Sequence, residues 1–216
     1  MTSAAFKQLL SERLGRMNLA VPEGASDRFE LYLRLLRRWN AKINLTALPL
    51  DPPVAGTIDR LLVEAVAASR LMEDLPGTWF DLGTGGGSPA VPLKILNPRR
   101  HLVMVESRAK KASFLREAVR ELELAGADVE NARIEDAVNQ VSLDVDVVTA
   151  RAITGRGLFD SVDRLLGPQG KFLWFRGDSD SNYMDNSGLR VFKLRETVEL
   201  CGPHSWLSVL QRDCST

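Results

Sequence analysis

The 216-residue sequence has few residues of the kinds that bind metals or form disulfides. It contains only two cysteines, Cys201 and Cys214, and two histidines, His101 and His204. The cysteines lack a paired spacing and two histidines are too few for a cluster, so we expect neither a disulfide framework nor a metal site. No apolar run approaches the length that spans a bilayer, and the N-terminus lacks the apolar core of a signal peptide. These absences predict a cytoplasmic protein that does not enter a membrane.

The sequence also lacks an excess of charge of either sign. Its 28 Lys and Arg residues balance 28 Asp and Glu residues, which gives a formal net charge of zero. Balance does not exclude a local basic patch, so binding to nucleic acid has to be argued from clusters of residues. The share of hydrophobic residues, 44%, is ordinary for a globular protein with one sizeable core.

The most informative motif is the segment 81–87, Asp-Leu-Gly-Thr-Gly-Gly-Gly, which follows an apolar run typical of a strand. Glycines let the backbone approach a ligand closely, so we expect a nucleotide-type cofactor here. Pro89 and Pro92 remove N–H donors from the next helix N-terminus that would grip a pyrophosphate, which favours S-adenosylmethionine over a dinucleotide. The frame Gly85-x-Gly87-x-x-Ala90 still fits the dinucleotide pattern, so the loop alone leaves that alternative open.

Glu106 supplies the second part of the cofactor prediction. It ends the apolar stretch 102–105, about twenty residues past the glycine loop, where an acidic side chain can accept hydrogen bonds from both ribose hydroxyls. The alternative is that Glu106 or Ser107 only caps the following helix.

Strand and helix patterns alternate from residue 78 onward, which predicts an α/β fold with a doubly wound, mostly parallel sheet. We expect a strand pair at 190–199 and 205–211 to close a sheet of seven strands, after a polar and mobile loop at 178–188. The other strands are expected near 78–82, 101–106, 128–132, 145–150 and 171–175, and helices at 89–96, 108–125 and 157–166.

Residues 1–76 show helical periodicity, with Asp27 and Glu30 as a possible capping pair and a third helix at 54–73. Short helices bury little surface alone, so we expect an N-terminal extension packed on the sheet of a core at 77–216.

Several segments together resemble the bacterial 16S rRNA guanine-N7 methyltransferases, also called glucose-inhibited division protein B. The resemblance begins with Arg38-Trp39-Asn40 and Asn44-Leu45-Thr46 and continues through 81–92, 111–122, 146–152 and 167–177. It implies a class I S-adenosylmethionine-dependent methyltransferase with a helical N-terminal extension. It also implies cofactor-binding residues, which are Gly83, Gly85, Gly87, Ser88, Glu106, Ile134, Glu135 and Arg151, and the glycine-loop motif adds Asp81 to them.

The sequence departs from the family pattern in four places. Gly86 replaces the usual proline of the glycine loop, and Arg176 replaces the lysine common after the fifth strand. The segment 60–65 reads Arg-Leu-Leu-Val-Glu-Ala where the family carries His-x-x-Asp-Ser, and the tail 201–206 is not basic.

The implied reaction needs no general base, because guanine N7 carries a lone pair and no proton. We therefore expect catalysis by positioning, with Arg151 and Arg133 as donors to guanine O6 or to flanking phosphates. An ion pair of Arg151 with Asp146 or Glu135 is the alternative, compatible role.

We expect RNA to bind at the basic cluster Arg34, Arg37 and Arg38, with Arg176, in preference to the basic helix at 108–120, whose glutamates offset its charge. The expected partner is 16S rRNA within the 30S subunit or its precursor, bound by a monomer. A methyltransferase of another acceptor and a non-catalytic RNA or assembly factor on the same fold remain the alternatives.

Overall fold

The computed structural model describes residues 1–72, 77–139, 144–177, 191–201 and 204–213, and these are arranged around one seven-stranded sheet. The strand order is β3-β2-β1-β4-β5-β7-β6, in which the first five strands are parallel and β7 runs antiparallel to both of its neighbours. This confirms the predicted doubly wound, mostly parallel sheet and its closing strand pair. The strands are β1 (Thr78–Leu82), β2 (His101–Val105), β3 (Ala127–Glu130), β4 (Val145–Arg151), β5 (Leu166–Gly177), β6 (Phe192–Glu199) and β7 (Ser205–Arg212).

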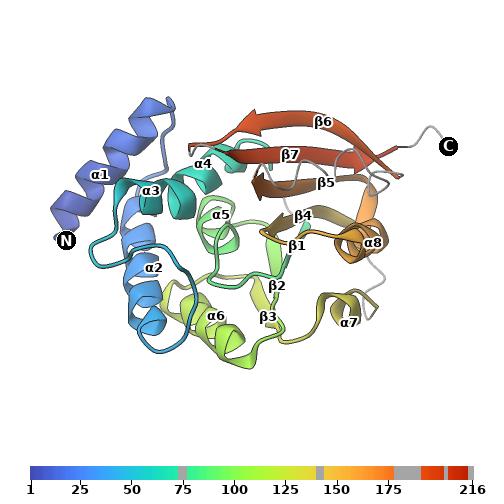
Figure 1. Ribbon diagram of the computed structural model, residues 1–216, viewed down its shortest axis with the longest axis horizontal. Coiled ribbons are helices and arrows are strands. Elements are labelled where there is room, and N and C mark those ends of the chain that lie inside the picture. The colour runs from blue at the N-terminus through green and yellow to red at the C-terminus, as the bar shows by residue number, and fades with distance from the viewer. Residues whose placement is uncertain (73–76, 140–143, 178–190, 202–203, 214–216) are drawn as a thin grey trace.

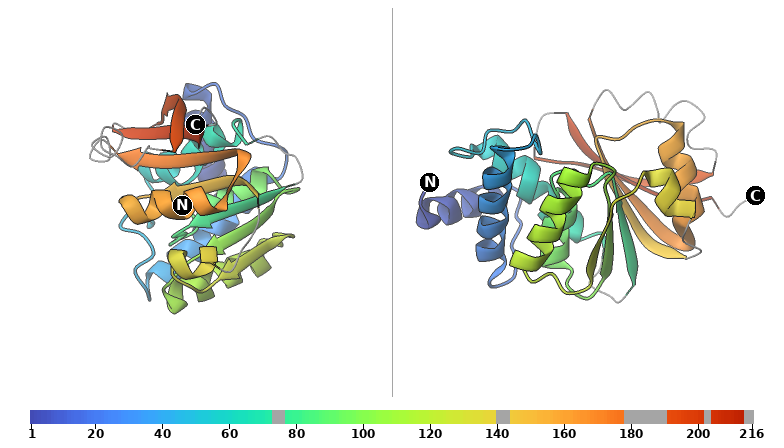
Figure 2. Two further views of the ribbon diagram at one scale, coloured as in Figure 1. Left: turned by 90° about the vertical axis from the view of Figure 1, so that its right-hand side faces the viewer. Right: turned by 90° about the horizontal axis from the view of Figure 1, so that it is seen from below.

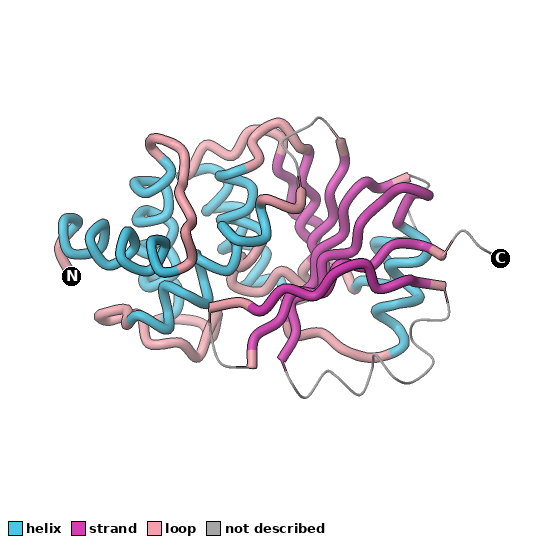
Figure 3. The backbone as a smooth tube through the Cα atoms, turned by 90° about the horizontal axis from the view of Figure 1, so that it is seen from above, coloured by secondary structure: helices cyan, strands magenta, loops and turns pink. Residues whose placement is uncertain are grey.

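Helices cover both faces of the sheet (Figures 1 and 2). The tube in Figure 3 shows the same three layers, with strands between two groups of helices. No helix in the described part of the chain is long and apolar enough to cross a membrane. One face carries α1 (Ser3–Arg16), α2 (Ala25–Asn40), α3 (Ala55–Ile58), α4 (Glu64–Ser69), α5 (Ala90–Leu96) and α6 (Ala109–Glu121), and the other carries α7 (Ile134–Asn139) and α8 (Arg156–Leu165).

Two apolar clusters fix these layers on the sheet. One runs without a break from Phe6 and Phe29 in the N-terminal helices to Trp79 and Leu173 in the strands. The other lies under α7 and α8, where Phe159 meets Trp174 edge to face at 5.3 Å between ring centroids. Because burial of apolar surface drives folding, the N-terminal helices are stabilised by the same core as the sheet.

Three local predictions need correction. The segment predicted as one helix at 54–73 contains a π-helical turn, η1 (Asp59–Val63), between α3 and α4. Helix α2 begins after Gly24, whose φ is 76°, and Asp27 forms an ion pair with Lys7 at 2.6 Å instead of capping that helix. Strand β5 begins at Leu166 and not near residue 171. Its first part was missed because Gly167, Pro168 and Gly170 are not typical of a strand.

Helix α7 was absent from the sequence prediction, because its six residues are too few to show a helical period. The polar segment at 178–188 lies outside the described residues, as does Cys214.

Candidate functional site

The glycine loop after β1 separates two cavities at the carboxyl ends of the parallel strands. Gly83, Gly85 and Gly87 have positive φ angles of 67°, 59° and 89°. At Gly83 an added Cβ would lie 2.1 Å from Cδ1 of Ile153, which would have to shift, and the positive φ of this position favours glycine. The loop therefore brings bare backbone to both cavities, which is what close approach to a ligand needs.

The first cavity, here called the cofactor cavity, has a volume of about 330 Å³. Glu106 lies in it with only 6% of its surface exposed. Its Oε2 accepts from the Gly85 N–H at 2.9 Å and its Oε1 from the Arg108 N–H at 2.8 Å. The lining residues are Gly83, Val105, Glu106, Ser107, Ala132, Arg133, Ile134, Glu135 and Ile153.

The N-cap residue of α6 is Arg108 and no side chain among the described residues caps this helix, so the alternative that Glu106 or Ser107 only caps it is wrong, while ribose binding by Glu106 stays a prediction. The carboxylate is held by the glycine loop and by the N-cap residue of α6, and each oxygen keeps a lone pair for a ribose hydroxyl. Apolar Ile134 and Ile153 flank the same cavity, as an adenine ring needs. The residues present therefore fit the adenosine part of S-adenosylmethionine.

The second cavity, here called the acceptor cavity, has a volume of about 410 Å³ and shares Gly83 and Ile153 with the first. Two guanidinium groups, those of Arg60 and Arg151, lie on its wall. Among the described residues that line it, none is a carboxylate, an imidazole or a thiol. The full lining is Leu36, Leu45, Thr46, Ala47, Leu48, Arg60, Leu61, Gly83, Thr84, Gly85, Gly86, Ser88, Arg151, Ala152 and Ile153.

Arg151 ends β4 and is the most constrained cation of the site. Its Nη1 donates to Glu64 Oε2 at 2.7 Å and to the Arg60 carbonyl at 2.9 Å, and its Cζ lies 4.5 Å from the Phe175 ring centroid. Burial lowers the pKa of the guanidinium, and the charge of Glu64 opposes that shift. Its Nε and Nη2 are buried and have no hydrogen-bond partner in the described part of the chain. The predicted ion pair of Arg151 with Asp146 or Glu135 is therefore wrong, because Glu64 is the partner.

The other predicted cofactor residues fall into two groups. Ser88 lines the acceptor cavity and its hydroxyl donates to the Leu61 carbonyl at 3.2 Å. Asp81 and Gly87 are buried beneath the loop and line neither cavity, since Asp81 accepts from the Thr149 hydroxyl and Gly87 packs against Tyr32. Their contacts support the loop, and a contact of either residue with the cofactor stays a prediction.

Arg133 is exposed and lines the cofactor cavity with Ile134 and Glu135. The structure does not bring Arg133 together with Arg151 in the acceptor cavity. Its catalytic role stays a prediction, on the opposite side of the glycine loop from Arg151.

The predicted RNA-binding arginines do not share one surface. Arg34, Arg37 and Arg38 line an open groove of about 740 Å³ at the C-terminal end of α2. Arg37 forms an ion pair with Asp51 at 2.8 Å, and Arg38 pairs with Glu117. Arg176 is only 9% exposed and its Nε donates to Ser208 Oγ at 2.8 Å. We predicted that Arg176 follows the fifth strand and binds RNA, but this residue is buried and lies within β5, not after it.

Sequence reasoning missed Arg60, Glu64 and Ser205, which surround Arg151. The spacing of Arg60 and Glu64, four residues apart in a helical segment, was the available signal. The motif around Trp39 has a structural explanation: Asn40 Oδ1 accepts from the Leu45 and Thr46 N–H groups at 2.8 and 3.0 Å. These bonds fold the loop whose residues 45–48 line the acceptor cavity.

The fold and the paired cavities define a class I S-adenosylmethionine-dependent methyltransferase. A family model described as rRNA small subunit methyltransferase G matches residues 25–199, and the chain belongs to this family. The relative from Geobacter sp. (strain M21), named ribosomal RNA small subunit methyltransferase G, is 29% identical over 84% of this chain and 82% of its own. The relative of that name from Xanthomonas euvesicatoria pv. vesicatoria is 41% identical over 68% of this chain and 66% of its own.

Solved structures share the fold at low sequence identity. A variant of MtNAS solved in complex with S-adenosylmethionine matches with a TM-score of 0.58 and 12% identity, over 86% of this chain and 74% of its own. Further solved chains that match this fold are methyltransferases or methylases by name. The predicted enzyme class and cofactor are thereby confirmed.

Proposed function

We propose that this protein transfers the methyl group of S-adenosylmethionine to N7 of a guanine in the decoding-region loop of 16S rRNA. The acceptor cavity carries the proposal, together with the family membership. It opens beside the glycine loop, offers two guanidinium groups, and is lined by no general base among the described residues. Such a site suits a nucleophile that carries no proton, such as guanine N7. This nucleophile needs hydrogen-bond donors that orient the base, and it needs no general base.

The residues of the site act by positioning. When bound, S-adenosylmethionine supplies an electrophilic methyl group, which the N7 lone pair takes up as the C–S bonding electrons return to sulfur. Glu106 holds the ribose, and the glycine loop keeps the cofactor against the acceptor cavity. The unpartnered Nε and Nη2 groups of Arg151 donate to oxygen atoms of the cofactor or of the acceptor nucleotide. Apolar residues at 45 and 48 exclude competing water.

The acceptor is an assembled or assembling 30S subunit, bound by a monomer of the protein in the cytoplasm. A net charge of zero gives little long-range attraction to bare RNA, so recognition depends on a shaped, protein-bound substrate. The groove of Arg34, Arg37 and Arg38 is the surface that contacts phosphates, and exposed Arg133 adds a cation at the rim of the cofactor cavity.

The test is transfer of labelled methyl from S-adenosylmethionine to 30S subunits, to precursor particles and to bare 16S rRNA. We expect label at a single guanine, with 30S or its precursor as the better substrate. N7-methylguanine is labile to chemical cleavage, so reverse transcription maps the position. Label at another position or on another class of acceptor would contradict the proposal. Cofactor binding without transfer to any of the three substrates would favour a non-catalytic assembly factor.

A further inference from the structure

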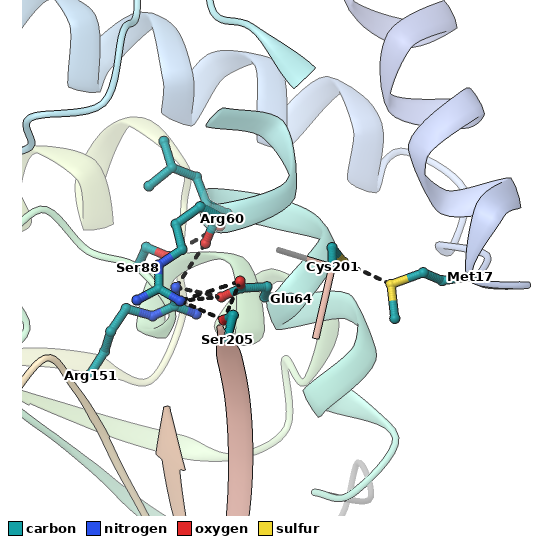
Figure 4. Close-up of polar contacts among 8 residues, drawn as sticks. Met17, Arg60, Glu64, Ser88, Arg151, Cys201 and Ser205 are labelled. Atoms are coloured by element: carbon teal, nitrogen blue, oxygen red, sulfur yellow. Dashed lines mark hydrogen bonds and ion pairs between the residues drawn. The ribbon is translucent and has the colours of Figure 1, made fainter. Parts of the chain in front are cut away.

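Four side chains, those of Arg60, Glu64, Arg151 and Ser205, meet at the wall of the acceptor cavity and form a cluster outside the glycine loop (Figure 4). Arg60 Nη1 lies 3.2 Å from Glu64 Oε2 and donates to Ser205 Oγ at 2.7 Å. The Ser205 hydroxyl in turn donates to Glu64 Oε1 at 2.7 Å. Arg151 Nη1 reaches the same carboxylate at 2.7 Å. Glu64 is therefore shared by two guanidinium groups from different elements of the fold.

The charges in this cluster do not cancel. Two cations share one carboxylate, so the cluster carries one net positive charge. The Glu64 side chain is 1% exposed, that of Arg151 10% and that of Arg60 32%. Glu64 is thus the most buried of these three side chains and Arg60 the most exposed, and both arginines line the acceptor cavity. The net positive charge of the cluster therefore belongs to residues on the wall of that cavity.

The π-helical turn η1 ties this cluster to the rest of the site. The Glu64 N–H donates to the Asp59 carbonyl, which is the spacing of a π-helix. Within the turn, the Arg60 carbonyl accepts from Arg151 and the Leu61 carbonyl accepts from Ser88 at 3.2 Å. The turn therefore contacts both the end of β4 and the glycine loop. Isolated π-helical turns are frequent at functional sites, and here the turn fixes where Arg60 projects.

We propose that Arg60 contacts O6 of the acceptor guanine and that Glu64 is a positioning residue that holds Arg60 and Arg151 in one arrangement. The proposal rests on the function proposed above. Arg60 Nη1 is used by Glu64 and Ser205, whereas its Nε and Nη2 groups have no hydrogen-bond partner in the described part of the chain. An arginine reads guanine through O6 and N7. A donor on N7 would occupy the lone pair that accepts the methyl group, so the contact that permits transfer is the one to O6.

The experiment compares Arg60→Gln and Glu64→Gln with a matched pair elsewhere. Arg16 and Glu12 have the same i,i+4 spacing on α1, with exposed side chains, and provide Arg16→Gln and Glu12→Gln as controls. For each variant, kcat and KM for 30S subunits are measured, and the cofactor dissociation constant is measured separately by calorimetry. The wild-type protein is assayed and its methylated guanine mapped in the same series.

We expect Arg60→Gln to lower kcat/KM for the 30S acceptor at least tenfold while the cofactor dissociation constant changes less than twofold. We expect Glu64→Gln to lower kcat at least tenfold. Adding Arg60→Gln to this variant should lower kcat by less than a further threefold, because both residues act through one arrangement. On an acceptor that carries 2-aminopurine, which lacks O6, at the target position, Arg60→Gln should lower kcat/KM by less than threefold. The α1 controls should stay within twofold of wild type.

Two outcomes overturn the proposal even when wild type methylates the mapped guanine. One is an Arg60→Gln variant within twofold of wild-type kcat/KM, and the other is a variant that weakens cofactor binding instead. Arg60 is partly exposed, so this variant decides the matter even if Glu64→Gln does not fold. A wild-type protein that labels no 16S guanine refutes the proposed function itself, and the two failures are thereby distinguished.

Discussion

At the scale of single residues, Glu106 has the most sharply defined task. Replacing it with alanine removes the two carboxylate oxygens proposed to accept from the ribose hydroxyls and frees the Gly85 and Arg108 N–H groups that it holds. Charge-assisted hydrogen bonds of this kind contribute on the order of 1.5–3 kcal/mol each, so Glu106→Ala should weaken S-adenosylmethionine binding tenfold or more.

Calorimetric titration measures the effect, with Glu121→Ala on the exposed side of α6 as the control. A variant at position 106 that binds the cofactor as tightly as wild type would remove Glu106 from the site.

Asp81 gives a prediction about pH. Burial raises the pKa of its carboxyl group from 3.8 to about 6, although the Thr149 and Thr84 hydroxyls oppose the shift. A carboxyl whose pKa is higher in the folded state binds more protons there, so its contribution to stability is present below about pH 4 and is lost as the pH rises toward 6. Ionisation of the buried Asp81 carboxyl group therefore destabilises the folded state at neutral pH.

Asp81→Asn cannot ionise and keeps an acceptor for the Thr149 hydroxyl. Its free energy of unfolding, relative to wild type, should increase by on the order of 3 kcal/mol between pH 4 and pH 7.5. Urea unfolding at several pH values measures this difference. The control is Asp160→Asn, at an exposed position of α8. A difference that does not vary with pH would show that Asp81 is not protonated in the folded state near pH 5.

At the scale of elements, the loop after α2 forms part of the wall of the acceptor cavity. Asn40 holds this loop by three hydrogen bonds, two accepted by its Oδ1 and one donated by its Nδ2 to the Thr46 carbonyl. Loss of these bonds should leave the residues 45–48 mobile at the rim of the acceptor cavity.

We expect Asn40→Ala to raise KM for 30S subunits about tenfold while the cofactor dissociation constant changes little. Stability should fall by about 1–3 kcal/mol, because buried backbone groups lose their partners. Exposed Asn44→Ala in the same loop is the control, and equal effects of the two variants on KM would contradict this role for Asn40.

The elements also show what a sequence can and cannot reveal. The inner parallel strands β1, β2 and β4 were predictable because they are mostly buried and read as largely apolar runs, as at 102–105 and 145–150. The glycine loop and Glu106 were predictable because the chemistry of the ligand dictates residue types at fixed spacing. The π-helical turn was not, since an apolar pattern does not distinguish an α-helix from a π-helix. The pairing of Arg151 with Glu64 was not either, because it joins residues 87 positions apart.

At the scale of the whole molecule, the proposed function requires a neutral protein to bind a highly charged particle, the 30S subunit or its precursor. The basic groove at α2 is the surface proposed to bind RNA, but its arginines differ in whether a carboxylate already pairs with them. Arg37 is paired with Asp51 and Arg38 with Glu117, whereas exposed Arg34 has no ion pair in the described part of the chain. A paired arginine has to give up its carboxylate partner to bind a phosphate, and the lost ion pair offsets part of the binding free energy. Arg34 should therefore contribute most to attraction of RNA.

Each phosphate contact releases counterions, so it adds roughly one unit to the slope of log affinity against log salt. Arg34→Gln should weaken 30S binding at low salt by several-fold and flatten that slope by about one, with no change in kcat at saturating substrate. Arg37→Gln should have a smaller effect, because the native ion pair already neutralises its charge. Exposed Arg195→Gln on β6, away from the groove, should leave the slope unchanged. If Arg195 matters as much as Arg34, attraction depends on overall charge, and the groove at α2 is not the RNA-binding surface.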